Sequence, residues 1–129
     1  MNGDDLARLV PFAGELGMEV DAAAAEEVRG RLAWAPERCT AGGVMHGGAL
    51  MALADTLGAI CAFLNLPEGA RTSTISSSTS FMRVVREGEV LAVSRPLHAG
   101  RSVIVVQTDL HDGEGRRVAQ VTQAQAVLS

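Results

Sequence analysis

Residues 47–64 have the sequence GGALMALADTLGAICAFL, which carries the strongest secondary-structure pattern of the chain. Large apolar side chains recur there at the spacing of one helical face, namely Leu50, Leu53, Leu57, Ile60 and Leu64. The opposite side holds small or apolar residues, with Asp55 as the exception. A helix that is apolar on all sides is typical of a buried core element. The sequence therefore predicts a buried central helix about 27 Å long, which the segment NLPEG at residues 65–69 ends.

Four predicted strands follow this helix, at residues 72–83, 89–97, 102–110 and 116–128. The turn signals between them are REG at 86–88, HAG at 98–100 and DG at 112–113. Such short, glycine-containing turns are typical of hairpins. We therefore expect an antiparallel meander in which each strand pairs with the next.

The chain before the helix predicts two further elements. Residues 4–16 favour a short helix that Pro11 kinks or breaks. Residues 17–35 look extended, although the alanines at 22–25 are equally compatible with a helical turn. With a loop at 37–46, the predicted class is α+β: one domain over residues 1–129, in which an antiparallel sheet of five or six strands wraps a long central helix.

The composition excludes several kinds of function. The chain has 129 residues, a net charge of −4 and no lysine, so Schiff-base and P-loop chemistry are excluded. The acidic balance, the lack of tyrosine and the 3% of aromatic residues argue against nucleic acid as a partner. The two cysteines make no disulfide framework, the N-terminus lacks the pattern of a signal peptide, and Asp55 interrupts the best candidate for a membrane span. These features predict a cytoplasmic protein with no membrane partner.

Asp55 is the residue that needs an explanation, because aspartate is a poor helix former and is rarely buried without a partner. It is either a structural carboxylate satisfied by backbone N–H groups or an arginine, or a base or nucleophile in a desolvated pocket. At the start of the same helix, His46, Gly47 and Gly48 are either a plain glycine turn or a source of free N–H groups for the negative charge of an acyl carbonyl. Together, a carboxylate and such donors indicate acyl-transfer chemistry.

Residues 44–56, VMHGGALMALADT, resemble the signature of the hotdog-fold acyl-CoA thioesterases, most closely the aspartate-using branch of phenylacetate degradation. The similarity covers about residues 36–128. It implies a hotdog fold and hydrolysis of aryl- or medium-chain acyl-CoA to the free acid and coenzyme A, with no metal and no cofactor beyond the substrate's own coenzyme A. It also implies a homodimer with active sites at the subunit interface, and a dimer of dimers.

The resemblance also assigns roles to residues. The Gly47 backbone N–H polarises the thioester carbonyl, and Asp55 of the other subunit acts as nucleophile or general base. His46 lines the site, and the hydroxyl of Thr74, or of Ser73 if the register differs by one residue, positions the water or the carboxylate. Further substrate contacts are expected from Gly48, Thr40, Met51, Arg83 and Arg101, the two arginines facing the phosphates of coenzyme A.

The sequence departs from the family pattern at two positions. Many relatives have Asn or Gln where Thr40 stands, and this difference affects how the carbonyl or a substrate ring is oriented. The glutamate-using branch has Ser or Thr where Ala59 stands, so this chain favours the aspartate branch.

Other interpretations of the sequence compete with a thioesterase. One is a non-catalytic acyl-CoA binding or sensing protein of the same fold, and another is a hotdog hydratase or dehydratase, whose differently spaced His and acid have no match here. A nucleophile made of Cys39 and His46 lacks an orienting third group. Cys61 is expected in the core, and His98 and His111 in exposed turns. The three histidines have no zinc-site spacing, so we expect no metal.

Overall fold

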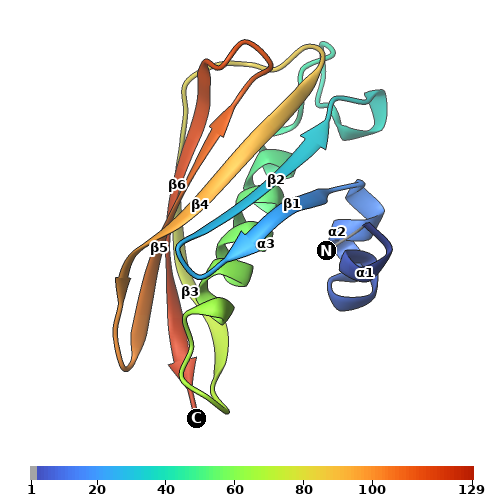
Figure 1. Cartoon of the computed structure of the whole chain (residues 1–129). Coiled ribbons are helices and arrows are strands. Elements are labelled where there is room, and N and C mark those ends of the chain that lie inside the picture. The colour runs from blue at the N-terminus through green and yellow to red at the C-terminus, as the bar shows by residue number, and fades with distance from the viewer. Residues whose placement is uncertain (1–2) are drawn as a thin grey trace.

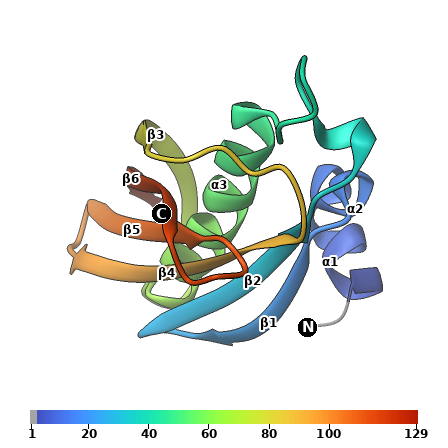
Figure 2. The same cartoon turned by 90° about the horizontal axis from the view of Figure 1, so that it is seen from above.

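The computed structural model describes residues 3–129, which form one six-stranded antiparallel sheet and three α-helices. The elements are α1 (Gly3–Leu9), α2 (Pro11–Leu16), β1 (Glu19–Ala24), β2 (Glu27–Ala33), the 3-10 turn η1 (Pro36–Arg38), α3 (Gly47–Leu64), β3 (Arg71–Phe81), β4 (Glu89–Ala99), β5 (Val103–His111) and β6 (Arg117–Leu128). The sheet curves around α3, and the two short helices lie beside β1 at one end (Figure 1, Figure 2). This arrangement confirms the α+β hotdog architecture that the sequence predicts.

The N-terminal half follows the predictions with two refinements. The expected N-terminal helix is two helices, because Pro11 begins α2 and so breaks the run as predicted. The extended segment at 17–35 is a hairpin of β1 and β2, so the alanines at 22–24 are strand and not helix. The central helix spans Gly47–Leu64, as predicted.

The predicted meander is wrong for β3. The strand order is β1-β2-β4-β5-β6-β3, so β3 pairs with β6 and not with β4. Residues 82–88 run across the end of the sheet between β3 and β4 (Figure 1). The turn signal at 86–88 correctly indicates a reversal of direction, but the extended residues before it let the chain span the sheet before β4 begins. As a result β3 is an edge strand, and it flanks α3 (Figure 2).

The hydrophobic core lies between one face of α3 and the inner face of the sheet. Leu50, Leu53 and Leu57 are buried there, with apolar side chains of β2, β4, β5 and β6. The predicted stripe ends earlier than expected, since Ile60 is half-buried and Leu64 is exposed.

The expectation that α3 is buried on all sides is wrong for the single chain. Met51, Asp55 and Phe63 lie on one face of the helix, at multiples of four residues, and all three are exposed. The sheet covers a single side of α3, so this second, mostly apolar face has no cover from its own chain.

By length and mean hydropathy, α3 is the one helix within residues 3–129 that is apolar enough to cross a membrane, despite the interruption by Asp55. Half of it is buried inside the fold, and a core helix passes the same test. The helix therefore gives weak grounds for a membrane span.

Candidate functional site

Asp55 projects from the uncovered face of α3 and is held by two side chains of the sheet. The Thr74 Oγ1 hydroxyl of β3 donates to Asp55 Oδ1 at 3.2 Å, and the Gln123 Nε2 amide of β6 donates to the same oxygen at 3.3 Å. No donor within residues 3–129 reaches the other oxygen, Oδ2. Asp55 is thus an exposed carboxylate fixed through one oxygen, and neither a backbone N–H nor an arginine satisfies it.

Two buried glutamines, which are not among the predicted site residues, organise this contact. Gln125 Nε2 donates to Thr74 Oγ1 at 2.8 Å, and Gln125 Oε1 accepts from Thr72 Oγ1 at 3.1 Å. Gln123 and Gln125 are 1% and 0% exposed. A signal for them exists in the sequence: along β6 they share the strand face of the buried Val121, so two amides occupy positions where apolar residues are expected.

The register question at β3 has a geometric answer. Thr74 contacts Asp55, while Ser73 points to the opposite face of the strand because neighbouring residues alternate. The Thr74 hydroxyl is therefore the one that lies against the carboxylate.

The N-terminus of α3 carries a second set of polar groups. His46 caps the helix, and its Nδ1 atom accepts a hydrogen bond from the Gly48 N–H at 2.7 Å. A Cβ atom on residue 48 would lie 2.8 Å from that nitrogen, so glycine is needed for the close approach. Because Nδ1 accepts, the proton of a neutral His46 lies on Nε2.

Among the first N–H groups of α3, that of Gly47 is the one without an acceptor among the described residues. The His46 carbonyl takes the N–H groups of Ala49 and Leu50, and no acceptor within residues 3–129 takes that of Gly47. A free N–H at the positive end of a helix favours a negatively charged or polarised oxygen. The structure thus separates the two glycines: the N–H of Gly48 is used internally, and that of Gly47 is available.

Gly47 and Asp55 are eight residues apart on one helix. At 1.5 Å per residue this places their backbones about 12 Å apart along the axis, which is too far for both to contact one thioester group. One chain therefore does not bring the Gly47 N–H and the Asp55 carboxylate together.

The remaining predicted contacts are dispersed. Met51 is exposed one turn before Asp55, and Thr40 lies exposed in the loop before α3. Arg83 follows β3 beside the β5–β6 turn, whereas Arg101 lies in the β4–β5 turn at the opposite end of the sheet. One chain therefore does not bring the two arginines together.

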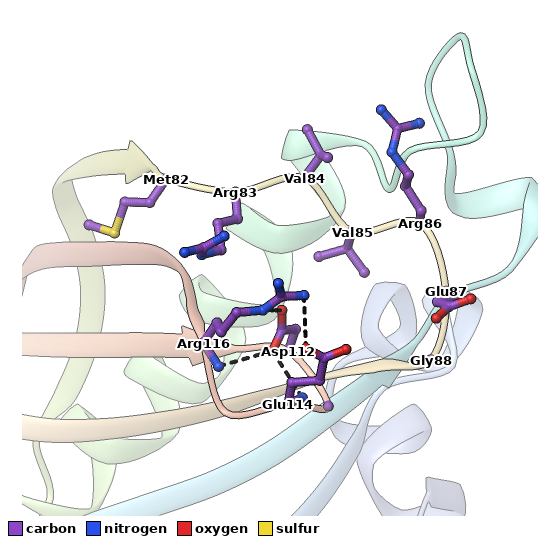
Figure 3. Close-up of a pocket in the computed structure, with 11 residues that line it drawn as sticks. Met82, Arg83, Val84, Val85, Arg86, Glu87, Gly88, Asp112, Glu114 and Arg116 are labelled. Atoms are coloured by element: carbon purple, nitrogen blue, oxygen red, sulfur yellow. Dashed lines mark hydrogen bonds and ion pairs between the residues drawn. The ribbon is translucent and has the colours of Figure 1, made fainter.

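Two hollows lie near the predicted residues. A pocket of about 210 Å³ is next to His46 and Gly48, between α2, η1 and the start of α3. A larger groove of about 750 Å³ lies between residues 82–88 and the β5–β6 turn and includes Arg83 (Figure 3). Neither hollow includes Asp55, whose surroundings in a single chain are an open face.

The charges of the larger groove are mostly paired. Asp112 accepts hydrogen bonds from the backbone N–H groups of Glu114 and Arg116 and from the Arg116 guanidinium. Partial desolvation raises the pKa of Asp112, but these donors outweigh it and hold the pKa below its ordinary value. Arg86 points away from the groove (Figure 3), so Arg83 is its available positive charge.

The cysteines and the remaining histidines lie apart from Asp55. Cys39 is half-buried, and Cys61 is fully buried as expected. His98 is exposed as expected, but His111 is half-buried, because it still pairs with β6 at the end of β5. No group of three or more potential metal ligands of the Cys, His, Asp or Glu type occurs in the part of the chain that the structure describes.

Burial raises the pKa of the Cys61 thiol to about 11. The raised pKa favours the protonated thiol in the folded state, so this contribution to stability is present below the ordinary thiol pKa near 9 and is lost as the pH rises towards 11. We expect iodoacetamide at pH 8 to modify Cys39 and to spare Cys61 until the protein is unfolded, as measured by peptide mass spectrometry. Rapid modification of Cys61 in the folded protein would contradict this environment.

A comparison with known protein families agrees with the observed fold and with the importance of α3 in it. The thioesterase superfamily model matches residues 42–119, which include all of α3. The chain belongs to the thioesterase superfamily.

Individual relatives are consistent with this assignment. The proofreading thioesterase EntH of Cronobacter sakazakii is 36% identical over 86 residues, which are 67% of this chain and 63% of that protein. The chain thus matches about three-fifths of that relative's length. A Mycobacterium tuberculosis protein named as a candidate esterase is 30% identical over 114 residues, 86% of this chain and 81% of its own. The crystal structure of a Haemophilus influenzae thioesterase superposes with a TM-score of 0.91 at 26% identity and covers 100% of this chain and 92% of that one.

Proposed function

We propose that this protein is an acyl-CoA thioesterase that hydrolyses aryl- or medium-chain thioesters, of the kind used in phenylacetate degradation. The observation that carries the proposal is the state of Asp55: one carboxylate oxygen is held by two donors, and the other has no donor among the described residues, on an exposed and mostly apolar face of α3. A carboxylate oxygen without protein donors is available to act as a base or a nucleophile. The superfamily membership supports the same chemistry.

The proposed reaction uses Asp55 and the Gly47 N–H together. As general base, Asp55 takes a proton from water while the water oxygen attacks the thioester carbonyl carbon. As nucleophile, it attacks that carbon itself to form an anhydride, which water then hydrolyses. On either route the Gly47 N–H stabilises the carbonyl oxygen as it becomes negative, the C–S bond breaks, and coenzyme A leaves as the thiol after taking up a proton. The residues need no further cofactor.

A homodimer supplies the missing half of each site. Because Gly47 and Asp55 of one chain are too far apart, Asp55 of one copy has to meet Gly47 of the other. The edge strand β3 offers the surface, since it is 11 residues long and presents the exposed Ile75. Long unpaired edges and apolar patches favour association with a further chain. The uncovered face of α3, with Met51 and Phe63, lies against the same edge and would be buried in such a pair, and two pairs can form a dimer of dimers.

The other predicted residues take supporting roles in the proposal. His46 and Gly48 shape the entrance beside Gly47, and Arg83 and Arg101 supply positive charge for the phosphates of coenzyme A. The two arginines lie at opposite ends of the sheet, so within one subunit they would contact different coenzyme A molecules. A cytoplasmic setting fits the free cysteines.

A panel of thioesters tests the function. Phenylacetyl-, hydroxyphenylacetyl-, hydroxybenzoyl-, hexanoyl- and decanoyl-CoA are incubated with the protein, and free thiol is measured. We expect turnover on at least one aryl or medium-chain substrate, well above the buffer rate. Tight binding of these compounds by calorimetry with no thiol release would instead identify a binding or sensing protein.

A further inference from the structure

We propose that Gln123 is a positioning residue that anchors one oxygen of Asp55 and so determines which oxygen reacts. The inference rests on the proposed role of Asp55. Gln123 Nε2 and Thr74 Oγ1 donate to the same atom, Asp55 Oδ1, at 3.3 and 3.2 Å. Two donors occupy the lone pairs of that oxygen. Oδ2 is therefore the atom that attacks the thioester or accepts the proton of water.

The direction of the Thr74 proton follows from Gln125. A threonine hydroxyl has one proton and can accept from other donors. Gln125 Nε2 donates to Thr74 Oγ1, so the Thr74 proton is left to point at Asp55, which as a carboxylate can only accept. Thr72 in turn donates to Gln125 Oε1 and fixes the orientation of that amide. Thr74 thus donates its single proton to the carboxylate and cannot donate a hydrogen bond to the substrate.

The burial of the Gln123 side chain is energetically unfavourable at one atom. Its Oε1 atom is buried and has no hydrogen-bond partner among the described residues. Leaving a buried polar atom unpaired is unfavourable, and such atoms are rare in folded proteins. An apolar side chain at position 123 would avoid this cost. The amide, unlike an apolar side chain, can donate a hydrogen bond to Asp55.

Gly58 makes room for this amide. A Cβ atom at position 58 would lie 2.2 Å from Gln123 Oε1 and 3.0 Å from Nε2. Glycine in the middle of a helix is otherwise unfavourable compared with alanine. Gly58 lies on α3 one turn after Asp55. The helix that carries the carboxylate therefore also provides the space for the Gln123 amide that binds it.

The strand that carries Gln123 is a rigid support. β6 pairs with β5 on one side and β3 on the other, and Gln123 lies opposite Val106 and Ser77 in these pairs. Precise positioning of a reacting group is best achieved from such fixed elements. Displacing a reacting group by about 1 Å can lower a rate by about 10²-fold.

The first test replaces Gln123 by methionine, which keeps the length of the side chain and removes the donor. We expect kcat on the best thioester of the panel to fall about 10- to 100-fold, with KM within about twofold of the native value. The matched control is Gln107→Met, because Gln107 lies on the other face of the sheet, donates to Thr122 and does not contact Asp55. It should keep native kcat. Thermal unfolding confirms that both variants fold.

The second test uses Gly58 and Gln123 as a pair. Gly58→Ala should lower kcat by displacing the amide, although it raises helix propensity. In a Gln123→Ala background there is no amide left to displace, so Gly58→Ala should cost no further activity. Such non-additivity indicates that Gly58 acts through Gln123, whereas a general effect on helix packing would lower kcat equally in both backgrounds.

A third readout does not depend on turnover. The ¹H–¹⁵N resonances of the Gln123 side-chain amide should differ between the native protein and the Asp55→Asn variant, while those of Gln107 should be the same in both. Full kcat in Gln123→Met, additive effects in the pair, or an unchanged Gln123 amide resonance would each overturn the inference. Loss of activity in Asp55→Asn together with full activity in Gln123→Met would overturn the anchor and leave the proposed function standing. An active Asp55→Asn variant would instead overturn the proposed role of Asp55.

Discussion

Replacing Asp55 by asparagine is expected to lower the turnover number by ~10²-fold or more, because an amide can neither take a proton from water nor attack a carbonyl carbon. The side-chain oxygen of asparagine can still accept from Thr74 and Gln123, so the fold and the contacts around the site should be kept. The loss should therefore fall on kcat, with KM nearly unchanged. Free thiol release from the best substrate of the panel measures the effect.

The control for this experiment is Asp109→Asn. Asp109 also accepts a hydrogen bond from a glutamine, Gln120, at 2.8 Å, but it lies on the other face of the sheet. It should keep native turnover and similar thermal stability. If Asp55→Asn retained near-native turnover, neither the base nor the nucleophile mechanism would survive.

The second large effect is expected at the edge strand. Replacing Ile75 by glutamate places a charge at the centre of β3, where the proposed dimer would bury it without a partner. We expect the protein to elute as a monomer in size-exclusion chromatography with light scattering. Turnover should fall by about 10²-fold or more, because each Asp55 then lacks the Gly47 N–H of a second copy, and removal of one such donor costs about 10²–10³ in rate.

Leu97→Glu provides the comparison. Leu97 is 58% exposed on β4, nearly the same as the 59% of Ile75, but it is away from the β3 edge. It should keep both the assembly and the turnover of the native protein. A monomeric Ile75→Glu variant with full activity would show that one chain contains a complete site, and would remove the argument for catalysis across an interface.

The features that residue spacing predicts depend on short separations along the chain, whereas the contact of Thr74 with Asp55, 19 residues away, is expected from the family resemblance alone. The helix could be predicted at about residues 47–64, in agreement with the observed Gly47–Leu64, because its apolar side chains repeat every three or four positions and a segment rich in turn residues ends it. The relation of Gly47 to Asp55 is likewise a property of one helix, since both the free N–H at its start and the carboxylate two turns later are fixed by helical geometry.

The contacts that the sequence does not predict join distant parts of the chain. Gln123 lies 68 residues after Asp55, and Gln125 lies 51 residues after Thr74. Gln125 meets Thr74 because β3 pairs with β6, and Gln123 meets Asp55 because α3 packs against β6. Hairpin signals join only consecutive strands, so they cannot indicate that β3 and β6 are neighbours. The two inward-facing glutamines of β6 do stand out as polar residues at apolar positions, so their presence was visible in the sequence, but not their partner.

Local spacing and composition thus determined the central helix, most strands, the α+β class and the pairing of a carboxylate with a helix N-terminus, because each follows from neighbouring residues and the covalent geometry between them. The tertiary structure decided the rest. It placed β3 at the edge, exposed Asp55 on an uncovered face, and brought the buried Gln123 to Asp55 and the buried Gln125 to Thr74. These features depend on which strands pair and on which side of a helix the sheet covers, and long-range packing alone sets both.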